Sequence, residues 1–296
     1  MIEAEHLRKR FNSTLAVDDV GFHIPRGEIF GLLGPNAAGK TTTMRMLCGL
    51  IAPDDGTVRI DGKPVQKAKS CFGYVAQSFG QYEELSVIEN LRFYASMYGV
   101  HDAERLDALL ERYALSAYRN KRAGTLSGGT KRRLALACAL SHDPDVLFLD
   151  EPTAGIDPVT RKQLWDDFYT LAAAGKTLFV TTHYMEEAQR CRRIAILDHG
   201  QMIAEGAPAA IKSELGEVRV FAVRVDYDPA LTAAAENHPG IRLVNQFGSE
   251  LRLMTMPEMG REAVDALVAP FAPDAAVYET EPNLEDVFMA LTQERR

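Results

Sequence analysis

The stretch from Glu28 to Leu50 constrains the fold of this chain more than any other part of the sequence. Its apolar run, Ile29 to Leu33, indicates a short buried strand, and a helix is expected to begin at Lys40. The turn between them fits the phosphate-binding pattern G-x-x-x-x-G-K-[ST]. The fixed positions of that pattern are Gly34, Gly39, Lys40 and Thr41. The sequence therefore predicts a strand, a phosphate-binding turn and a helix in succession.

The chemistry of this turn suits an anionic ligand. Main-chain N–H groups in a tight turn converge on an anion, and the helix behind them adds the positive end of its dipole. Lys40 can reach the outer phosphates of a nucleotide, and the Thr41 hydroxyl can bind the Mg²⁺ that accompanies them. The alternative is a chance match in an ordinary strand-loop-helix. Further motifs in the rest of the chain are needed to distinguish the two interpretations.

Composition narrows the class of protein. The 296 residues suffice for one large domain and a smaller one, or for two of middling size. A net charge of −8 argues against nucleic acid or an anionic lipid surface as the main partner. The four cysteines are scattered without a CxxC pair, as expected for reduced thiols in the cytosol. No apolar run has the ~18 residues of a membrane span. Any role at a membrane is therefore expected to act through a partner protein.

Alternating strands and helices predict an α/β first domain, residues 1–215, with a largely parallel sheet. IEAEHL and DDVGFHI are expected to be two short strands joined by a basic, polar loop that contains Phe11. A helical block at about residues 84–142 interrupts the strands and indicates an inserted subdomain. Its first helix is predicted to start at a capping box formed by Ser86 and Glu89, and to bury Val87, Leu91, Tyr94 and Tyr98.

Polar features follow four of the predicted strands. They are the phosphate-binding turn, Gln77, the pair Asp150-Glu151, and His183. In a parallel sheet the carboxyl ends of the strands share one edge, and ligands bind at that edge. We therefore expect a nucleotide site with its chemistry assembled around it. Taken alone, Phe11 is better explained as a partly buried loop aromatic, and Ser127 or Thr130 as a helix cap.

The tail, residues 216–296, has a different pattern. Its strands and helices follow the order βαββαβ, with one further amphipathic helix at the end. This order predicts a small α+β module of the ferredoxin-like type. The tail contains no cluster with catalytic spacing, so a stabilising or docking role is the expectation.

Several motifs in sequence order resemble those of the ATP-binding subunit of ATP-binding cassette (ABC) transporters over about residues 1–215. GPNAAGKTT looks like Walker A, YVAQ like the Q-loop and LSGGT like the family signature. VLFLDEP looks like Walker B, AGIDP like the D-loop and VTTH like the switch histidine. The resemblance implies a P-loop NTPase cassette with a mostly parallel core sheet, an antiparallel β subdomain and an inserted helical subdomain.

The resemblance also implies residue roles, with ATP and Mg²⁺ as cofactors. Phe11 would stack on adenine, and Asp150 would hold the metal together with Thr41 and Gln77. The catalytic residues would be Glu151 as general base, His183 as sensor of the terminal phosphate, Gln77 and Lys40. The phosphates would be bound by Gly34, Pro35, Asn36, Ala37, Ala38, Gly39, Lys40, Thr41 and Thr42.

The signature implies that two cassettes share each site. Ser127, Gly128 and Gly129 would cap the ATP held by the opposite protomer, and Asp157 in the D-loop is counted with the nucleotide-binding residues. The resemblance is strongest to type-2 exporters, a class that includes drug and antibiotic efflux systems. It implies a pair of cassettes, expected to be a homodimer, on a separately encoded permease at the cytoplasmic face of the membrane.

Two positions depart from the family pattern. Family members usually have Gly where this chain has Ala37, and Gln where it has Thr130. If position 37 needs a positive φ, alanine there is strained by ~1 kcal/mol and nucleotide binding is weakened severalfold. Two alternatives stay open. One is a soluble ATPase of the same family that acts on nucleic acid or ribosomes, and the other is a nucleotide-binding regulatory subunit with weakened hydrolysis. No nucleic-acid partner is expected from the charge.

Overall fold

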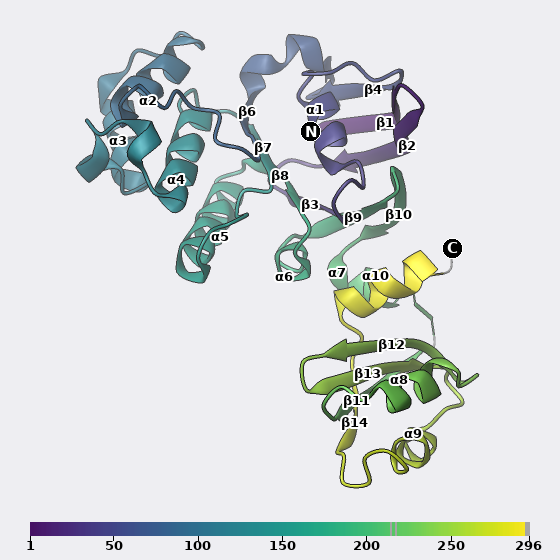
Figure 1. The fold of residues 1–296 in the computed structure, drawn as a ribbon. Coiled ribbons are helices and arrows are strands. Elements are labelled where there is room, and N and C mark those ends of the chain that lie inside the picture. Colours follow the sequence, from purple (N-terminus) through teal and green to yellow (C-terminus); the bar gives the residue numbers. More distant parts are fainter. Residues whose placement is uncertain (214, 217, 294–296) are drawn as a thin grey trace. The chain divides into compact units, whose positions relative to one another are not determined.

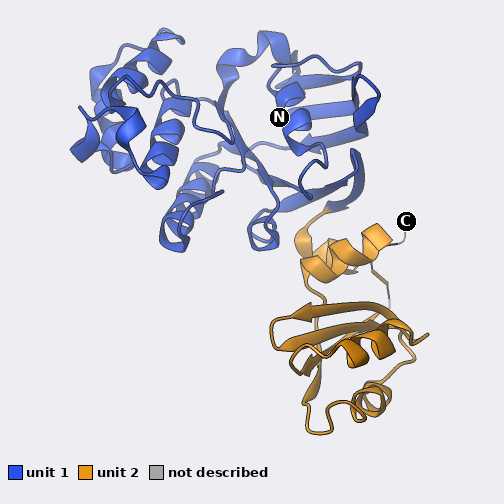
Figure 2. Ribbon diagram, viewed as in Figure 1, with its two compact units in different colours: residues 1–205 blue, residues 206–296 orange. Residues whose placement is uncertain are grey.

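A computed structural model of the protein describes residues 1–213, 215–216 and 218–293. The chain forms two compact units, Met1–Glu205 and Gly206–Arg296 (Figure 2). The sequence prediction places the domain boundary at residues 215–216 instead. The helix α7 (Pro208–Ser213), which lies between these two positions, contacts α10 (Leu284–Gln293) of the second unit.

The described part of the first unit contains a six-stranded sheet, labelled in Figure 1. Its strands, from edge to edge, are β10 (Gln201–Gly206), β9 (Arg193–Asp198), β3 (Ile29–Leu33), β8 (Thr177–Thr182), β7 (Val146–Asp150) and β6 (Phe72–Val75). The strands from β9 to β6 pair in parallel. All residues of β3, β7 and β8 are buried, as their continuous apolar runs predict.

An antiparallel sheet forms the second layer of this unit. Its order is β2 (Thr14–Ile24), β1 (Ile2–Phe11), β4 (Asp55–Ile60) and β5 (Lys63–Pro64). Phe22 of β2 packs on Phe30 and Phe179 of the parallel sheet, with ring centroids 5.3 and 5.5 Å away. Burial of each such phenylalanine contributes roughly 2–3 kcal/mol to folding. The hairpin predicted around Asp61-Gly62 is confirmed by the pairing of β4 with β5.

The prediction of two short N-terminal strands with a basic loop between them is wrong. β1 continues to Phe11 and pairs with β2 as far as Phe11 opposite Thr14, so the turn lies at residues 12–13. Register shifts interrupt the pairing, and His6 and Asp19 have positive φ angles of 51° and 57°. Such bulges break the regular alternation of apolar and polar residues from which strands are predicted.

Helices complete the first unit. α1 (Lys40–Leu47) follows β3, and α5 (Pro158–Ala173) and α6 (Met185–Ala188) follow β7 and β8. The short 3₁₀ turns η1 (Val65–Lys67) and η2 (Lys69–Cys71) precede β6. The inserted helical block contains α2 (Val87–Ser96), α3 (Ala103–Arg112), η3 (Ser116–Tyr118), η4 (Ala123–Thr125) and α4 (Gly128–Ala139).

The capping box that starts α2 is confirmed. Ser86 Oγ accepts a hydrogen bond from Glu89 N at 3.3 Å, and Glu89 Oε2 accepts one from Ser86 N at 2.8 Å. The predicted apolar stripe is wrong at its end. α2 stops at Ser96, and Tyr98 is 40% exposed and stacks on the His142 ring at 3.6 Å.

The second unit has the ferredoxin-like order that its sequence predicts. Its elements after α7 are β11 (Arg219–Arg224), α8 (Pro229–Glu236), β12 (Ile241–Phe247), β13 (Glu250–Thr255), α9 (Arg261–Val268), β14 (Val277–Thr280) and α10. The strands pair antiparallel in the order β12-β13-β11-β14. A core of its own, which includes Phe221, Leu231, Leu253 and Val264, holds α8 and α9 on the sheet.

Candidate active site

The four strands that carry the predicted site residues are neighbours in the parallel sheet. β3, β8, β7 and β6 lie side by side in Figure 1. The phosphate-binding turn follows β3, His183 follows β8, and Gln77 lies two residues beyond β6. Asp150 is the last residue of β7, and Glu151 comes next. The expected gathering of polar features at one edge is thus the arrangement that the sheet order produces.

Neighbouring atoms pack so closely against the glycines of the phosphate-binding turn that they leave no room for a side chain. A Cβ on Gly34 would lie 2.2 Å from Leu197 O, and one on Gly39 would lie 2.5 Å from Ala16 O. Gly39 also has a φ of 103°, which glycine adopts without strain. α1 begins directly after it and has no acidic residue in its first turn. The positive end of the helix therefore faces the turn, and no acidic side chain of the helix's own first turn opposes it.

Lys40 points back over this turn. Its Nζ donates hydrogen bonds to Gly34 O at 2.8 Å and Pro35 O at 2.9 Å. Only 5% of the residue is exposed, and burial lowers the pKa of its ammonium group while the nearby carboxylates of Glu151 and Asp150 raise it. The ammonium group lies above the main-chain atoms that would surround a phosphate.

Ala37 has the left-handed conformation that its position in the turn requires. Its φ is 65°, a region in which a Cβ is strained by ~1 kcal/mol. The residue is exposed, so no packing of its methyl group offsets the strain. The condition attached to the sequence prediction for Ala37 is met.

Asp150 and Thr41 offer oxygen ligands to a cation. Asp150 is buried, and its Oδ1 accepts a hydrogen bond from Thr181 Oγ1 at 2.6 Å and lies 3.4 Å from Thr41 Oγ1. Burial raises the pKa of Asp150, and the hydrogen bonds from the two threonines oppose this shift. Mg²⁺ takes few protein ligands, chiefly carboxylate and hydroxyl oxygens. Asp150 and Thr41 therefore fit such an ion. Gln77, the third residue predicted to bind the metal, is hydrogen-bonded to Glu151 in this structure.

All of the predicted catalytic side chains meet at the carboxylate of Glu151. Gln77 Nε2 donates a hydrogen bond to Glu151 Oε2 at 2.9 Å. Lys40 Nζ lies 3.7 Å and His183 Nδ1 3.3 Å from Glu151 Oε1. Glu151 is 7% exposed, so these contacts occur in a largely water-excluded site. This carboxylate therefore stands beside the phosphate-binding turn as the candidate proton acceptor.

The main chain at Glu151 is unusual. Its φ is 45°, which is uncommon for a residue with a Cβ. The N–H of Glu151 donates to Thr181 Oγ1 at 3.0 Å, and its carbonyl accepts from Arg132 Nη2 at 3.3 Å. Burial lowers the pKa of Arg132, and Asp150 and Glu151 oppose this shift. Uncommon backbone conformations persist where neighbouring groups fix them, and they cluster at functional sites.

A second buried carboxylate supports the segment around His183. Glu187 is 1% exposed and accepts hydrogen bonds from the hydroxyls of Thr153 and Thr182. Thr182 Oγ1 in turn accepts a hydrogen bond from Tyr184 N at 3.0 Å. The residues on either side of His183 are therefore tied to the loop that follows Glu151.

The remaining predicted residues lie outside this cluster of contacts. Phe11 ends β1 and is 47% exposed. Ser127 is the N-cap of α4, and its Oγ accepts from Thr130 N at 3.4 Å. Asp157 is the N-cap of α5 and accepts hydrogen bonds from Val159 N and Thr160 N. Hydrogen bonding with the side chain and the main chain of Thr160 lowers the pKa of Asp157. The cap at Ser127 agrees with the simplest interpretation of the sequence, and nucleotide contacts of these residues stay predictions.

Sequence reasoning missed Arg132, Thr181 and Glu187. Arg132 stands in the basic run Lys131-Arg132-Arg133, which resembles a solvated helix face. Thr181 lies within an apolar strand, and Glu187 on a short helix after His183. A buried role for these residues depends on contacts between distant segments, and no local pattern signals it.

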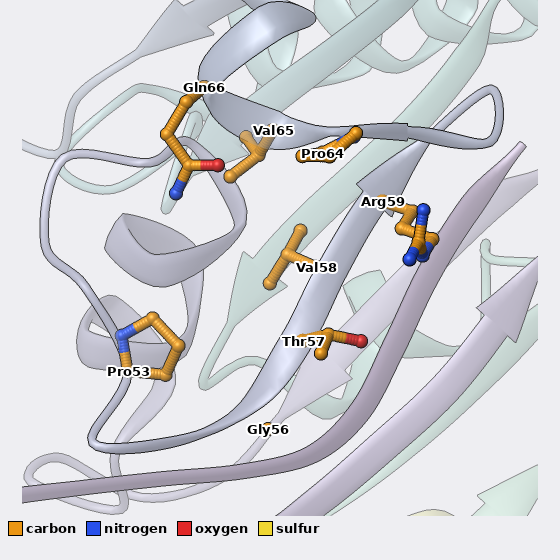
Figure 3. A pocket seen from close by; sticks show the side chains of 8 residues that line it. All are labelled: Pro53, Gly56, Thr57, Val58, Arg59, Pro64, Val65 and Gln66. Atoms are coloured by element: carbon orange, nitrogen blue, oxygen red, sulfur yellow. The ribbon is translucent and has the colours of Figure 1, made fainter.

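A surface hollow of about 210 Å³ beside β4 and β5 is lined by none of the predicted site residues (Figure 3).

Comparisons with known proteins bear on this site. The protein family described as ABC transporter matches residues 17–154. Nod factor export ATP-binding protein I of Cupriavidus pinatubonensis is 39% identical over 305 residues, which cover 99% of this chain and 90% of that protein. The chain belongs to the ABC transporter family. It is an ATP-binding cassette, the subunit type that hydrolyses ATP in such transporters.

Other members of the family match this ABC cassette over different shares of their own length. The probable multidrug ABC transporter ATP-binding protein YbhF of Escherichia coli is 43% identical over 221 residues, which are 72% of this chain but 38% of YbhF. MJ0796, a bacterial ABC transporter cassette solved as a dimer, is 27% identical with a TM-score of 0.66. That likeness covers 70% of this chain and 98% of MJ0796. The same cassette was also solved in a post-hydrolysis state bound to ADP and Pi.

Within the residues that the structure describes, no helix of this ABC cassette is both long enough and apolar enough to cross a membrane.

Proposed function

We propose that this cassette binds and hydrolyses ATP to drive export by a separately encoded membrane permease, and that it works as a pair of cassettes. The observation that carries the proposal is the convergence of Lys40, Gln77 and His183 on the buried carboxylate of Glu151. The Nod factor export relative supports the direction of transport. The cassette is expected at the cytoplasmic face of the membrane, held there by its permease.

The proposed chemistry is attack of water on the terminal phosphorus of ATP, with cleavage of its bond to the β-phosphate oxygen. Glu151 orients the water and accepts its proton, and ADP and phosphate leave. Lys40, the turn and the end of α1 stabilise charge on the phosphoryl oxygens. His183, within reach of the same carboxylate, contacts the terminal phosphate. Thr41 and Asp150 would hold Mg²⁺, which would supply neutralisation of phosphate charge and orientation of the leaving group.

A second cassette is needed to complete each site in this proposal. Ser127 and the two glycines after it begin α4, and their hydrogen bonds stay within that helix start. A Cβ added to Gly128 would meet open space, so a ligand can approach its main chain closely. The dimeric relative MJ0796 supports a pair of cassettes. In the pair that we propose, each α4 faces the ATP bound by the other cassette.

A groove between the core and the helical block offers a place for the permease. It encloses about 330 Å³, and its lining includes Phe72, Gln81, Tyr94, Met97, Tyr98 and Cys138. Met97 and Tyr98 of its lining are 65% and 40% exposed, so large side chains with apolar surface lie together at the rim of this groove. Gln81 lies four residues after Gln77 in the same connecting segment. An amphipathic helix of a membrane protein bound in this groove would therefore contact the segment that carries the side-chain amide of Gln77.

The variant Glu151→Gln tests this function. It keeps the size of the side chain and removes the proton acceptor, so ATP binding should be retained while turnover falls by roughly 10²–10⁴-fold. ATP should then trap a closed pair of cassettes, measured as a doubling of mass by size-exclusion chromatography with light scattering. Unchanged ATPase activity, or monomers with ATP bound, would contradict the proposal.

The partner is tested separately by purification of the wild-type cassette from its native cells. The proposal expects a membrane protein to co-purify and to make ATP-dependent substrate movement possible in vesicles. Co-purification with ribosomes or nucleic acid in its place would point to the soluble alternative.

A further inference from the structure

Arg132 joins the inserted helical block to the catalytic edge of the sheet. From α4 its Nη1 donates to Ala76 O at 2.7 Å, and its Nη2 donates to Gln77 O at 3.0 Å and to Glu151 O at 3.3 Å. One guanidinium group thus binds main-chain carbonyls of two segments that follow different strands. The planar fork of arginine spans such acceptors, whereas the ammonium group of lysine is a single point of contact.

These hydrogen bonds hold the main chain next to Glu151, the proposed general base. The carboxylate of Glu151 meets the amide of Gln77 at 2.9 Å, and Arg132 holds the main chain on both sides of that contact. Glu151 has its uncommon φ of 45° while its N–H is held by Thr181 and its carbonyl by Arg132 and Ala154 N. A conformation of this kind needs such fixation from its surroundings.

The same helix carries the signature residues. Ser127 caps α4, and Arg132 follows five positions later, about 7.5 Å along the helix axis. A neighbouring residue strengthens the link to the segment after β6. Lys131 pairs with Glu83 at 2.9 Å, and its Nζ lies 4.9 Å from the centroid of the Phe79 ring. A shift of α4 therefore moves both the Ser127 end and the contacts of Gln77.

A hollow beside Arg132 leaves room for such a shift. It encloses about 170 Å³ between α4 and the loop after Glu151. Its lining residues are Phe79, Gly128, Lys131, Arg132, Ala135, Ala154, Gly155 and Ile156. The helix is not packed tightly against that loop, so polar contacts such as those of Arg132 transmit its position.

We propose that Arg132 is a positioning residue that transmits the position of Ser127 to the Gln77–Glu151 pair. ATP seated against α4 of one cassette then sets the geometry of that same cassette's own catalytic site, and the two sites of a pair respond to each other. The inference rests on the proposed function, in which Ser127 caps the ATP held by a second copy. Arg132 itself contacts main chain and no substrate.

The variant Arg132→Lys keeps the charge and loses the fork. We expect kcat for ATP hydrolysis to fall about 10- to 100-fold, because small misplacement of reacting groups is costly. KM should stay within about twofold, because the ATP contacts of the phosphate-binding turn remain. The Hill coefficient of the ATP dependence should fall toward that of independent sites.

Arg105→Lys is the matched control. Arg105 donates to Ser141 O at 2.7 Å and Leu140 O at 3.2 Å, so it binds carbonyls at the other end of the helical block, away from Glu151. This variant should leave kcat and the Hill coefficient unchanged. Arg132→Ala adds a rescue experiment. Millimolar guanidinium should restore part of its kcat by entering the hollow, and ammonium should not.

Hydrogen–deuterium exchange provides a measurement that does not need activity. Arg132→Lys should exchange faster than the wild type at residues 76–83 and 151–154, and Arg105→Lys should not. Wild-type kcat in Arg132→Lys, equal losses in both lysine variants, or unchanged exchange at these segments would overturn the proposal. A wild-type cassette without ATPase activity would defeat the proposed function, and the exchange comparison would still decide the role of Arg132.

Discussion

Ala37 has a backbone conformation that is unfavourable for a residue with a Cβ. Its φ of 65° aims the main chain of the turn toward a phosphate, but the methyl group makes this conformation unfavourable by ~1 kcal/mol. A turn without nucleotide can relax to relieve the strain, whereas nucleotide binding selects the strained form. Part of the binding free energy is then used to restore the conformation at this residue.

We therefore expect Ala37→Gly to bind ATP about fivefold more tightly, the equivalent of ~1 kcal/mol. The change is measured by titration of ATP in the presence of Mg²⁺. Ala38→Gly is the control, because Ala38 is buried, its φ is not positive, and its loss should bring no gain in affinity. An unchanged Kd with a raised melting temperature would mean that the strain is equal in the free and bound turns.

At the level of single residues, the strand, turn and helix that carry Gly34, Gly39 and Lys40 could be predicted because their pattern is a matter of local spacing. The roles of these residues toward a nucleotide stay predictions. Arg132 and Glu187 act through contacts with segments far away in the sequence. Their positions could not be inferred without the fold.

Among the elements, those with strong local signals were predicted most accurately. The capping box placed the start of α2, and continuous apolar runs gave β3, β7 and β8. The long hairpin of β1 and β2 was missed because bulges at His6 and Asp19 interrupt its alternation. Bulges depend on pairing with the neighbouring strand, so the sequence of one strand alone does not reveal them.

The helix α10 is anchored by a buried ion pair. Arg252 of β13 binds Asp286 through Nε–Oδ1 at 3.2 Å and Nη2–Oδ2 at 2.6 Å, and Asp286 is 1% exposed. Oδ2 also accepts a hydrogen bond from Asn283 N at 2.9 Å. Removal of one charge from a buried pair leaves the other without compensation.

Asp286→Asn should therefore lower the free energy of unfolding of the second unit by about 3 kcal/mol. Asp265→Asn is the control, because Asp265 and Arg261 form an exposed pair at 3.5 Å, expected to contribute less than about 1 kcal/mol. Urea unfolding followed by circular dichroism compares the variants. Equal effects of the two substitutions would show that burial does not govern the strength of the Asp286 contact.

At the scale of the whole molecule, chemistry and the second unit are separate along the chain. Every predicted site residue lies between Phe11 and His183, within the first unit. The second unit has its own antiparallel sheet and its own apolar core. That the two units are independent domains stays a prediction, and their separation in sequence makes it testable.

A chain that ends at Gly206 keeps all of β10 and every site residue, and lacks α7 together with the rest of the second unit. We expect it to fold and to bind ATP with a Kd within about twofold of the intact chain, because no side chain of the site is removed. Isothermal titration of both chains with ATP measures this. The same truncation with Lys40→Ala is the control, and it should lose affinity through loss of the phosphate contact. A truncated chain that folds but binds ATP tenfold more weakly would contradict the separation, and would assign the second unit a part in forming the nucleotide site.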